Sequence, residues 1–374
     1  MLVALAEDQS YVMLTHKLSR VALQRLREAQ RFFCPQCKEP LLLKIGQVKI
    51  PHFAHRKNSQ CDSLFTEGES QAHLLGKQQL FTLFQRLELE VKLEPYLKDL
   101  QQRPDLLVTK NNQQYAIEFQ CSRLVKDRFI ERTKGYKEHG ITPVWILNTP
   151  SEKYKQQGLI KISINHYQYL FLKRTGRPFL MSYDVERQTF YYINHLIFFQ
   201  GQQYFGFGQS IPLSQQAFPF YVPQRLAFDL FQTLFARYKQ ENTQYLHARL
   251  MFSRGGVQDD LLRAMYELRL SRDNLPPFIG VMIKGQESMT KPAVEWQILL
   301  FYYIFLYRFT FSGLTDDIVF YFLDWANLST TKQAQQTVTR YVRLLVQLKI
   351  EGASSNIDEG LLIKHVYDEL FAIE

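Results

Sequence analysis

Residues 104–121 read Pro104-Asp-Leu-Leu-Val-Thr-Lys-Asn-Asn-Gln-Gln-Tyr-Ala-Ile-Glu-Phe-Gln-Cys121, and this stretch predicts a β-hairpin. Two runs of strand-forming residues flank Asn111-Asn112, and asparagine tolerates the left-handed backbone that a two-residue hairpin loop requires. Paired residue numbers then sum to a constant, so Asp105 falls opposite Glu118. Neighbouring carboxylates repel each other, and a hard divalent cation such as Mg²⁺ held between them would relieve that repulsion.

A side-chain amide belongs to the same expected site. Gln120 follows Glu118 by two residues and therefore projects from the same face of the strand. The alternative is that Asp105 and Glu118 are rim residues that pair separately, for instance with Arg103 or Arg123.

A helix expected before the hairpin carries three ionisable groups on one stripe. Glu69, His73 and Lys77 recur every fourth residue, and the stripe continues as the apolar Leu80 and Phe84. A solvated face would not run straight into an apolar one, so we expect this helix to point inward and to place its three ionisable groups at a cavity.

The surrounding pattern alternates helix and strand. The expected order is helix (69–87), three strands (89–94, 104–110, 113–121), helix (126–139) and strand (143–148). In the second helix, Arg132 and Tyr136 share a stripe. Arg132 is a candidate phosphate ligand and Tyr136 a candidate lining residue, although a solvated arginine and a core tyrosine would show the same spacing.

A cysteine–histidine cluster precedes this region. Cys34-Pro-Gln-Cys37 is followed by His52-Phe-Ala-His55 and by Cys61. Two cysteines separated by two residues can bend around one Zn²⁺, and a second pair completes the tetrahedron. The intervening residues 41–50 alternate like a hairpin with a turn at Gly46. We favour Cys34, Cys37, His55 and Cys61 as ligands of a structural zinc, with His52 as the alternative to either of the last two.

Bulk properties favour a basic protein of a reducing compartment. The formal net charge is +9 over 374 residues, which suits a polyanionic partner. Three of the four cysteines lie in one short stretch, as in a metal site of a cytoplasmic protein. The start of the chain does not resemble a secretory signal. The longest apolar run, residues 298–307, is about half of a bilayer span, so we expect a buried helix and no membrane span.

Three domains are expected from these changes of pattern. We predict a zinc-binding β-rich module (1–62), an α/β domain (63–170) and a C-terminal domain of strands followed by helices (171–374). Strand signals cover 179–185, 189–199 and 204–208, and helix signals cover 226–239, 293–308 and 332–348.

The first 150 residues closely resemble the CoiA competence protein family, whose members take part in natural transformation of bacteria. The resemblance rests on the cysteine and histidine pairs above, on Glu67-Gly-Glu69-Ser-Gln-Ala-His73-Leu-Leu-Gly-Lys77, and on Arg103-Pro-Asp105, Glu118-Phe-Gln120-Cys-Ser122 and Trp145-Ile-Leu. It implies a multidomain α/β protein. Its expected parts are a zinc-finger-like N-terminus, a central domain of the PD-(D/E)xK, restriction-endonuclease-like type, and a mainly α-helical C-terminus. It also implies a role in processing or recombining incoming DNA.

The resemblance assigns roles by position. Glu69 matches the acid of the first helix, Asp105 the aspartate of the motif and Glu118 its second acid. Gln120 stands where lysine is usual, and glutamine can orient a water molecule but cannot act as a general base. Lys77 is a candidate for the missing positive charge.

We hypothesise from these residues a metal-dependent hydrolysis of DNA. Asp105, Glu118 and the backbone carbonyl of Phe119 would hold Mg²⁺ or Mn²⁺, with Glu69 completing the ligand set. Lys77 or Arg132 would offset charge in the transition state. His73 is a candidate phosphate ligand or proton carrier, and equally a structural hydrogen-bonding group.

Two alternatives stay open. One is a non-catalytic accessory protein that binds single-stranded or branched DNA and docks recombination proteins. The other is a zinc-ribbon adaptor that binds a polymerase, which would leave the opposed acids unexplained.

Overall fold

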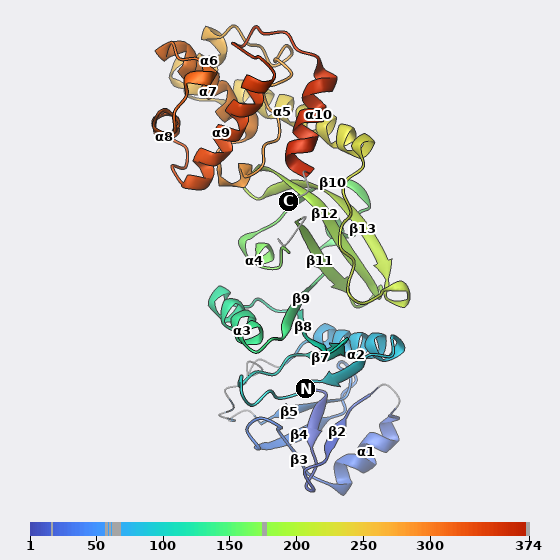
Figure 1. Ribbon diagram of the computed structural model, residues 1–374. Coiled ribbons are helices and arrows are strands. Elements are labelled where there is room, and N and C mark those ends of the chain that lie inside the picture. The colour runs from blue at the N-terminus through green and yellow to red at the C-terminus, as the bar shows by residue number, and fades with distance from the viewer. Residues whose placement is uncertain (16–17, 57–58, 60, 62–68, 174–177, 372–374) are drawn as a thin grey trace.

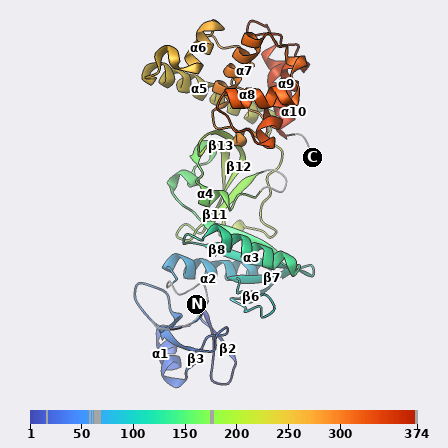
Figure 2. The same ribbon diagram turned by 90° about the vertical axis from the view of Figure 1, so that its left-hand side faces the viewer.

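The computed structural model describes residues 1–374 except 16–17, 57–58, 60, 62–68, 174–177 and 372–374. A small sheet at the N-terminal end, a larger sheet in the middle and a helical region at the C-terminal end follow one another along the molecule (Figures 1 and 2). Glu67, which begins one of the family motifs, and the expected boundary at residues 62–63 lie outside the described residues.

The N-terminal sheet has five strands in the order β2-β1-β3-β4-β5. Its strands are β1 (Val3–Leu5), β2 (Tyr11–Met13), β3 (Phe32–Phe33), β4 (Pro40–Lys44) and β5 (His52–His55). Helix α1 (Arg20–Ala29) begins after Ser19, whose side chain accepts a hydrogen bond from the Ala22 N–H. β1 pairs antiparallel with β2, with Val3 opposite Met13.

The prediction of a hairpin within residues 41–50 is wrong for the second strand. β4 pairs with β5, Lys44 opposite His52, so the returning strand starts at His52 and the connection extends through Pro51. Proline lacks the backbone N–H that a strand pairing uses, which helps to delay the return.

The central sheet has eight strands in the order β10-β13-β12-β11-β9-β8-β7-β6. The strands are β6 (Glu90–Leu93), β7 (Leu106–Lys110), β8 (Gln113–Gln120), β9 (Thr142–Asn148), β10 (Gly158–Ser163), β11 (Phe179–Asp184), β12 (Thr189–Gln200) and β13 (Gln203–Pro212). β9 runs parallel to both of its neighbours, and the other pairs are antiparallel. The expected limit of the central domain at residue 170 therefore falls between two strands of one sheet.

Helices accompany this sheet and form the C-terminal region. Those beside the sheet are α2 (Gln71–Arg86), α3 (Lys126–Glu138) and the short α4 (His166–Tyr169). The C-terminal helices are α5 (Phe228–Phe252), α6 (Asp260–Glu267), α7 (Ala293–Tyr307), α8 (Asp316–Trp325), α9 (Lys332–Gln347) and α10 (Glu359–Phe371). α7 is buried from Ala293 to Ile304, whereas Phe305, Leu306 and Tyr307 are exposed, so the apolar run 298–307 is buried only in its first part.

No helix within the described part of the chain combines the length and apolarity that crossing a bilayer requires. One hydrophobic core joins the N-terminal sheet to α2 and to strands β6–β8, since Leu2 and Leu41 belong to the same cluster as Leu80, Phe84 and Leu106. The N-terminal module is thus packed directly against the part of the sheet that carries the expected site.

Candidate active site and metal centre

The hairpin β7–β8 has the loop and the register that the sequence predicts. Asn111 and Asn112 both have positive φ angles, 49° and 65°, as a two-residue loop requires. Leu106 lies opposite Ile117, and continuing this register by one residue brings Asp105 level with Glu118.

The two helices α2 and α3 cover opposite faces of this hairpin. Successive strand residues point to opposite faces, and the two sets have different neighbours. Leu106, Ile117 and Phe119 pack in the cluster that contains α2, whereas Leu107 and Ala116 pack with Tyr136 of α3. The contacts of a hairpin side chain therefore show whether it lies on the face covered by α2 or on the face covered by α3.

Asp105 turns its carboxylate toward α2. It accepts a hydrogen bond from the Phe119 N–H at 2.8 Å and lies 3.1 Å from Nε2 of His73 and 3.9 Å from Nζ of Lys77. Burial opposes ionisation of this carboxyl, but the His73 imidazole and the Lys77 ammonium outweigh it and lower the pKa of Asp105. Asp105 is thus held as a buried anion.

Lys77 lies at the centre of this arrangement and is fully buried. Its Nζ lies 2.5 Å from Oε1 of Glu69 and also donates to Glu94. Burial alone would lower the pKa of the ammonium, yet the three surrounding carboxylates raise it above its ordinary value. Glu69 lies just before Ser70, the N-cap residue of α2, so the helix begins two residues later than expected. Glu69, His73 and Lys77 nevertheless converge with Asp105, and Nδ1 of His73 lies 3.5 Å from Glu69.

Glu94 is a member of this network that the sequence did not reveal. It follows β6, is 2% exposed, and accepts hydrogen bonds from the N–H groups of Leu2 at 2.9 Å and Val3 at 3.2 Å. Glu69 pairs in addition with the Met1 amino group at 2.5 Å. These contacts tie the first strand of the N-terminal module to the acidic network.

Glu118 turns toward α3 instead. It accepts from Nη2 of Arg132 and from the Tyr136 hydroxyl at 2.5 Å. Burial raises the pKa of Glu118 in spite of the Arg132 charge, and the negative charge of Asp105 raises it further. The two carboxylates still influence each other, but the expected arrangement, with both turned toward one shared cation, is not present in this conformation, because each binds a cation of a different helix.

The other predicted site residues have mixed placements. Gln120 ends β8 half-buried, with its amide donating to the Ser122 carbonyl at 2.8 Å. Arg132 is only 7% exposed, so its guanidinium faces Glu118 and not solvent. Phe119 packs tightly on α2, since a Cβ on Gly76 would lie 2.2 Å from its ring. Gly76 is what lets the helix approach the strand so closely.

The cysteine–histidine cluster assembles with the four expected donors. One donor atom from each of Cys34, Cys37, His55 and Cys61 lies within 4.8 Å of the others. His52, in contrast, has its Nδ1 2.8 Å from the Ile50 carbonyl. Three sulfurs and one imidazole nitrogen form a closed donor set of the kind that holds a structural zinc ion. This cluster could bind a metal, and its chemistry is consistent with structural zinc.

Among the residues that the structure describes, this is the one group of three or more His, Cys, Asp or Glu donors within mutual reach of a single ion. In this conformation Asp105 is paired with His73 and Lys77, and Glu118 with Arg132. The two clusters thus differ in how their charge is neutralised.

Two family models match this chain. The CoiA N-terminal domain matches residues 15–64, and the CoiA nuclease-like domain matches residues 69–225. The chain belongs to the CoiA competence protein family. It is also 34% identical over 200 residues to competence protein CoiA of Bacillus subtilis (strain 168), which is 53% of this chain and 52% of that protein. The match thus spans about half of either chain. No solved structure matches this chain.

Proposed function

We propose that the chain is a metal-dependent DNA-processing protein whose nuclease site lies at the open end of the β7–β8 hairpin. Membership in the CoiA family, with its nuclease-like domain, supports a role in competence. The finer proposal is hydrolysis of DNA phosphodiesters, in a site of the PD-(D/E)xK type that contains Asp105, Glu118 and Gln120.

The observation that carries the proposal is the burial of Lys77 among Glu69, Glu94 and Asp105. Taking ionised groups out of water costs free energy that their mutual attraction repays only in part, so such a network is a poor device for stability alone. Ionisable groups with shifted pKa values gather preferentially at functional sites. The network lies in the segment that matches the nuclease-like domain.

The donor chemistry suits Mg²⁺ or Mn²⁺, which prefer carboxylate and carbonyl oxygens. Asp105, Glu118 and the Phe119 carbonyl would hold the ion, and Glu69 would complete the ligand set. When bound, the ion would polarise a phosphate and acidify a water molecule. The protein's own contribution is the Lys77 charge, which would stabilise the negative charge of the transition state.

Zinc in the N-terminal module is proposed as a structural ion held by Cys34, Cys37, His55 and Cys61. Thiolate ligands must stay reduced, so we place the protein in the cytoplasm. Recombination proteins are the partners that a competence role suggests.

A cleavage assay tests the proposed site. Labelled single-stranded, branched and duplex DNA would be incubated with Mg²⁺ or Mn²⁺ and wild-type protein, Asp105→Asn or Glu118→Gln. Glu90→Gln serves as the control, because Glu90 is an exposed acid at the neighbouring strand β6. We expect cleavage by the wild type and the control, and a loss of at least about 100-fold in both site variants, since each removes a ligand of the ion. Equal cleavage by all four proteins contradicts the assignment.

A second candidate function is a non-catalytic DNA-binding accessory protein with a degenerate nuclease fold. It is favoured by the ion pairs Lys77–Glu94 and Arg132–Glu118, which neutralise the acids without a metal ion. DNA binding that persists in Asp105→Asn, together with no cleavage by the wild type under any divalent metal, would select this function.

A further inference from the structure

The positive charge of this chain is unevenly distributed. Residues 1–61 contain ten Lys and Arg against four Asp and Glu, whereas residues 226–374 contain 15 against 17. The N-terminal module is thus the most basic part for its size, and the C-terminal region is slightly acidic. A polyanion is therefore attracted to the N-terminal end of the molecule.

The candidate phosphate ligands of the acidic site do not provide a binding surface. Arg132 is buried against Glu118, and His73 lies between Glu69 and Asp105. A DNA chain must therefore be held by other, exposed groups.

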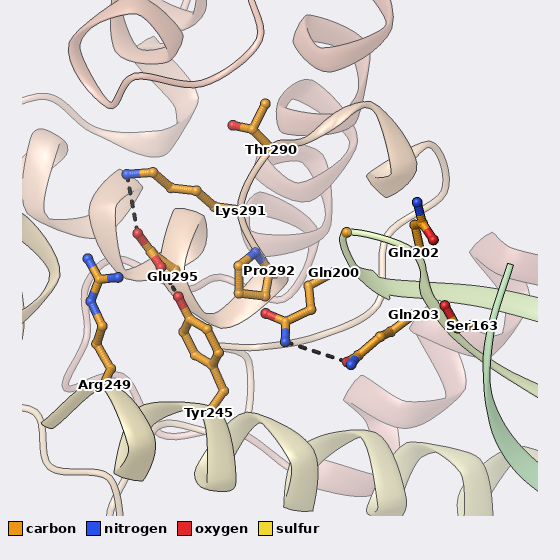
Figure 3. A pocket seen from close by; sticks show the side chains of 11 residues that line it. Ser163, Gln200, Gln202, Gln203, Tyr245, Arg249, Thr290, Lys291, Pro292 and Glu295 are labelled. Atoms are coloured by element: carbon orange, nitrogen blue, oxygen red, sulfur yellow. Dashed lines mark hydrogen bonds and ion pairs between the residues drawn. The ribbon is translucent and has the colours of Figure 1, made fainter. Parts of the chain in front are cut away.

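The cavities of the C-terminal region are poor candidates for that role. A cavity of ≈ 610 Å³ lies between the β12–β13 turn, α5 and the start of α7, and an adjoining cavity of ≈ 670 Å³ lies between α5, the connection from α5 to α6 and the start of α7. Figure 3 shows Lys291 and Tyr245 both directed at the buried Glu295, and Lys291 lies 3.2 Å from it. Arg249 pairs with Asp259 at 2.8 Å. Each of these cations already has an acid beside it.

Helix α1 offers a different surface. Its apolar side is narrow, with Leu23 buried and Leu26 half-buried, and Arg20, Arg25 and Arg27 are exposed. Arg20 and Arg27 are two turns apart and lie on one stripe. Glu28 is the one acid of this helix.

Neighbouring groups extend this basic surface. Nη2 of Arg20 donates to the Gly46 carbonyl at 2.6 Å, which places the start of α1 beside the β4–β5 connection and its exposed Lys44. Arg31, which follows the helix, is highly exposed and lies 4.0 Å from Glu7. We call Arg20, Arg27, Arg31 and Lys44 the N-terminal basic face.

Helix α3 is less suitable because its charges alternate in sign. Lys134 pairs with Glu138 at 3.5 Å, and Asp127 and Glu131 lie among its other cations. The N-terminal basic face is the more uniformly positive of the two surfaces.

We propose that the N-terminal basic face binds the phosphate backbone of DNA and so holds the strand on the module whose first residues contact the acidic network. This inference rests on the proposed function for its ligand, but it does not require catalysis. The face carries arginines without aromatic residues for base stacking, so we expect the phosphates to be recognised irrespective of sequence. α1 uses its apolar side inside the module and exposes Val21 as its one large apolar group, but Val48 of the neighbouring connection is also exposed, so the test includes a lipid surface as an outcome.

The test is a binding titration with Asp105→Asn as the parent protein, which prevents cleavage. A fluorescein-labelled 30-nucleotide single strand and its duplex would be titrated over a range of salt concentrations. Arg20→Gln/Arg27→Gln is compared with Arg308→Gln/Arg343→Gln, which removes the same charge from exposed positions of the C-terminal region. Zinc content and thermal melting of each variant check the fold.

We expect the α1 double variant to bind about tenfold more weakly near 0.15 M salt, and the slope of log K against log salt to become shallower by about 1.5. The control should change affinity less than twofold. Conversely, Glu28→Gln should bind about two- to fourfold more tightly, and a gain of this kind does not arise from misfolding. The difference in affinity between single strand and duplex identifies the preferred form.

Three results would overturn the inference. In the first, the two double variants weaken DNA binding equally. In the second, the parent protein does not bind DNA. In the third, the α1 variant no longer binds anionic phosphatidylglycerol vesicles but binds DNA like the parent. Failure of the nuclease proposal looks different: the wild type binds DNA through α1 and cleaves none.

Discussion

The two buried clusters of this protein solve the same electrostatic problem in opposite ways. In the acidic network, Glu69, Glu94 and Asp105 surround the ammonium of Lys77, so the protein supplies its own counter-charge. In the cysteine–histidine cluster, the four donors lie within 4.8 Å of one another, and a divalent ion is the natural counter-charge for their thiolates. We therefore expect the cysteine–histidine cluster to need its metal ion for folding, and the acidic network to need one only for catalysis.

The largest expected effect comes from the cysteine–histidine cluster. Structural zinc contributes on the order of 10 kcal/mol to the folding of small zinc modules. We expect His55→Gln to lose bound zinc and to make residues 1–61 sensitive to proteolysis. The ring of His52 faces the Ile50 carbonyl, so His52→Gln should keep its zinc and its resistance to proteolysis. Elemental analysis and limited proteolysis measure this. Equal zinc content in the two variants would contradict the ligand set.

Removing the internal cation of the acidic network should have the next largest effect. Lys77→Met removes the ammonium that three buried carboxylates share, and loss of one partner of a buried ion pair destabilises a protein by about 3–5 kcal/mol. Urea unfolding should show this loss, and Mg²⁺ or Mn²⁺ should restore part of it by replacing the ammonium. Lys92→Met, at an exposed lysine of β6, is the control and should unfold like the wild type. An undiminished stability of Lys77→Met would mean that the network is not an ion-paired unit.

A smaller effect is expected from pH. The pKa values of Glu69, Glu94 and Asp105 are lowered in the folded protein, because nearby cations outweigh the cost of burial. Carboxylates of this kind stabilise the fold above their unfolded pKa values, about 4, and this contribution disappears as pH falls through the lowered values. Stability should therefore decline below about pH 4. The free energies of unfolding of wild type and Glu94→Gln, measured by urea titration between pH 3 and 7, should converge at the acid end. If the two pH profiles stayed parallel, the buried carboxylates would not be the cause of the acid sensitivity.

The smallest effect concerns the helix–strand contact beneath the acidic network. Gly76→Ala places a methyl group 2.2 Å from the Phe119 ring, and overpacking of this kind costs about 1–3 kcal/mol. We expect a lower melting temperature and weaker cleavage, because the shift of Phe119 moves the N–H that binds Asp105. Gly46→Ala is the matched control, since its added Cβ meets no atom within 4 Å. Identical behaviour of the two variants would show that the close approach is unimportant.

Local patterns predicted much of the sheet around the site. The Asn111-Asn112 loop, the hairpin register and the helices on either side follow from short-range signals, and the structure confirms them. The fourfold spacing of Glu69, His73 and Lys77 likewise predicted an inward stripe that meets Asp105.

The remaining features depend on contacts between distant residues. Glu94 joins the network through Lys77, and it is held in place by N–H groups that lie 91 and 92 positions away in the chain, a contact that no local pattern encodes. Register alone did not show that Asp105 and Glu118 would turn toward different helices, since that depends on the cations that α2 and α3 present. The extension of the sheet through β11–β13 also depends on a contact between distant residues, because β11 joins the sheet by pairing in parallel with β9.

The most direct test of the central claim is a crystal structure of the protein grown with excess Mn²⁺ and examined at the manganese absorption edge. Our account predicts an anomalous peak bound by Asp105, Glu118 and the Phe119 carbonyl, with Glu118 released from Arg132. The contrary result is a structure at saturating Mn²⁺ with no peak there and with the Lys77 and Arg132 ion pairs intact.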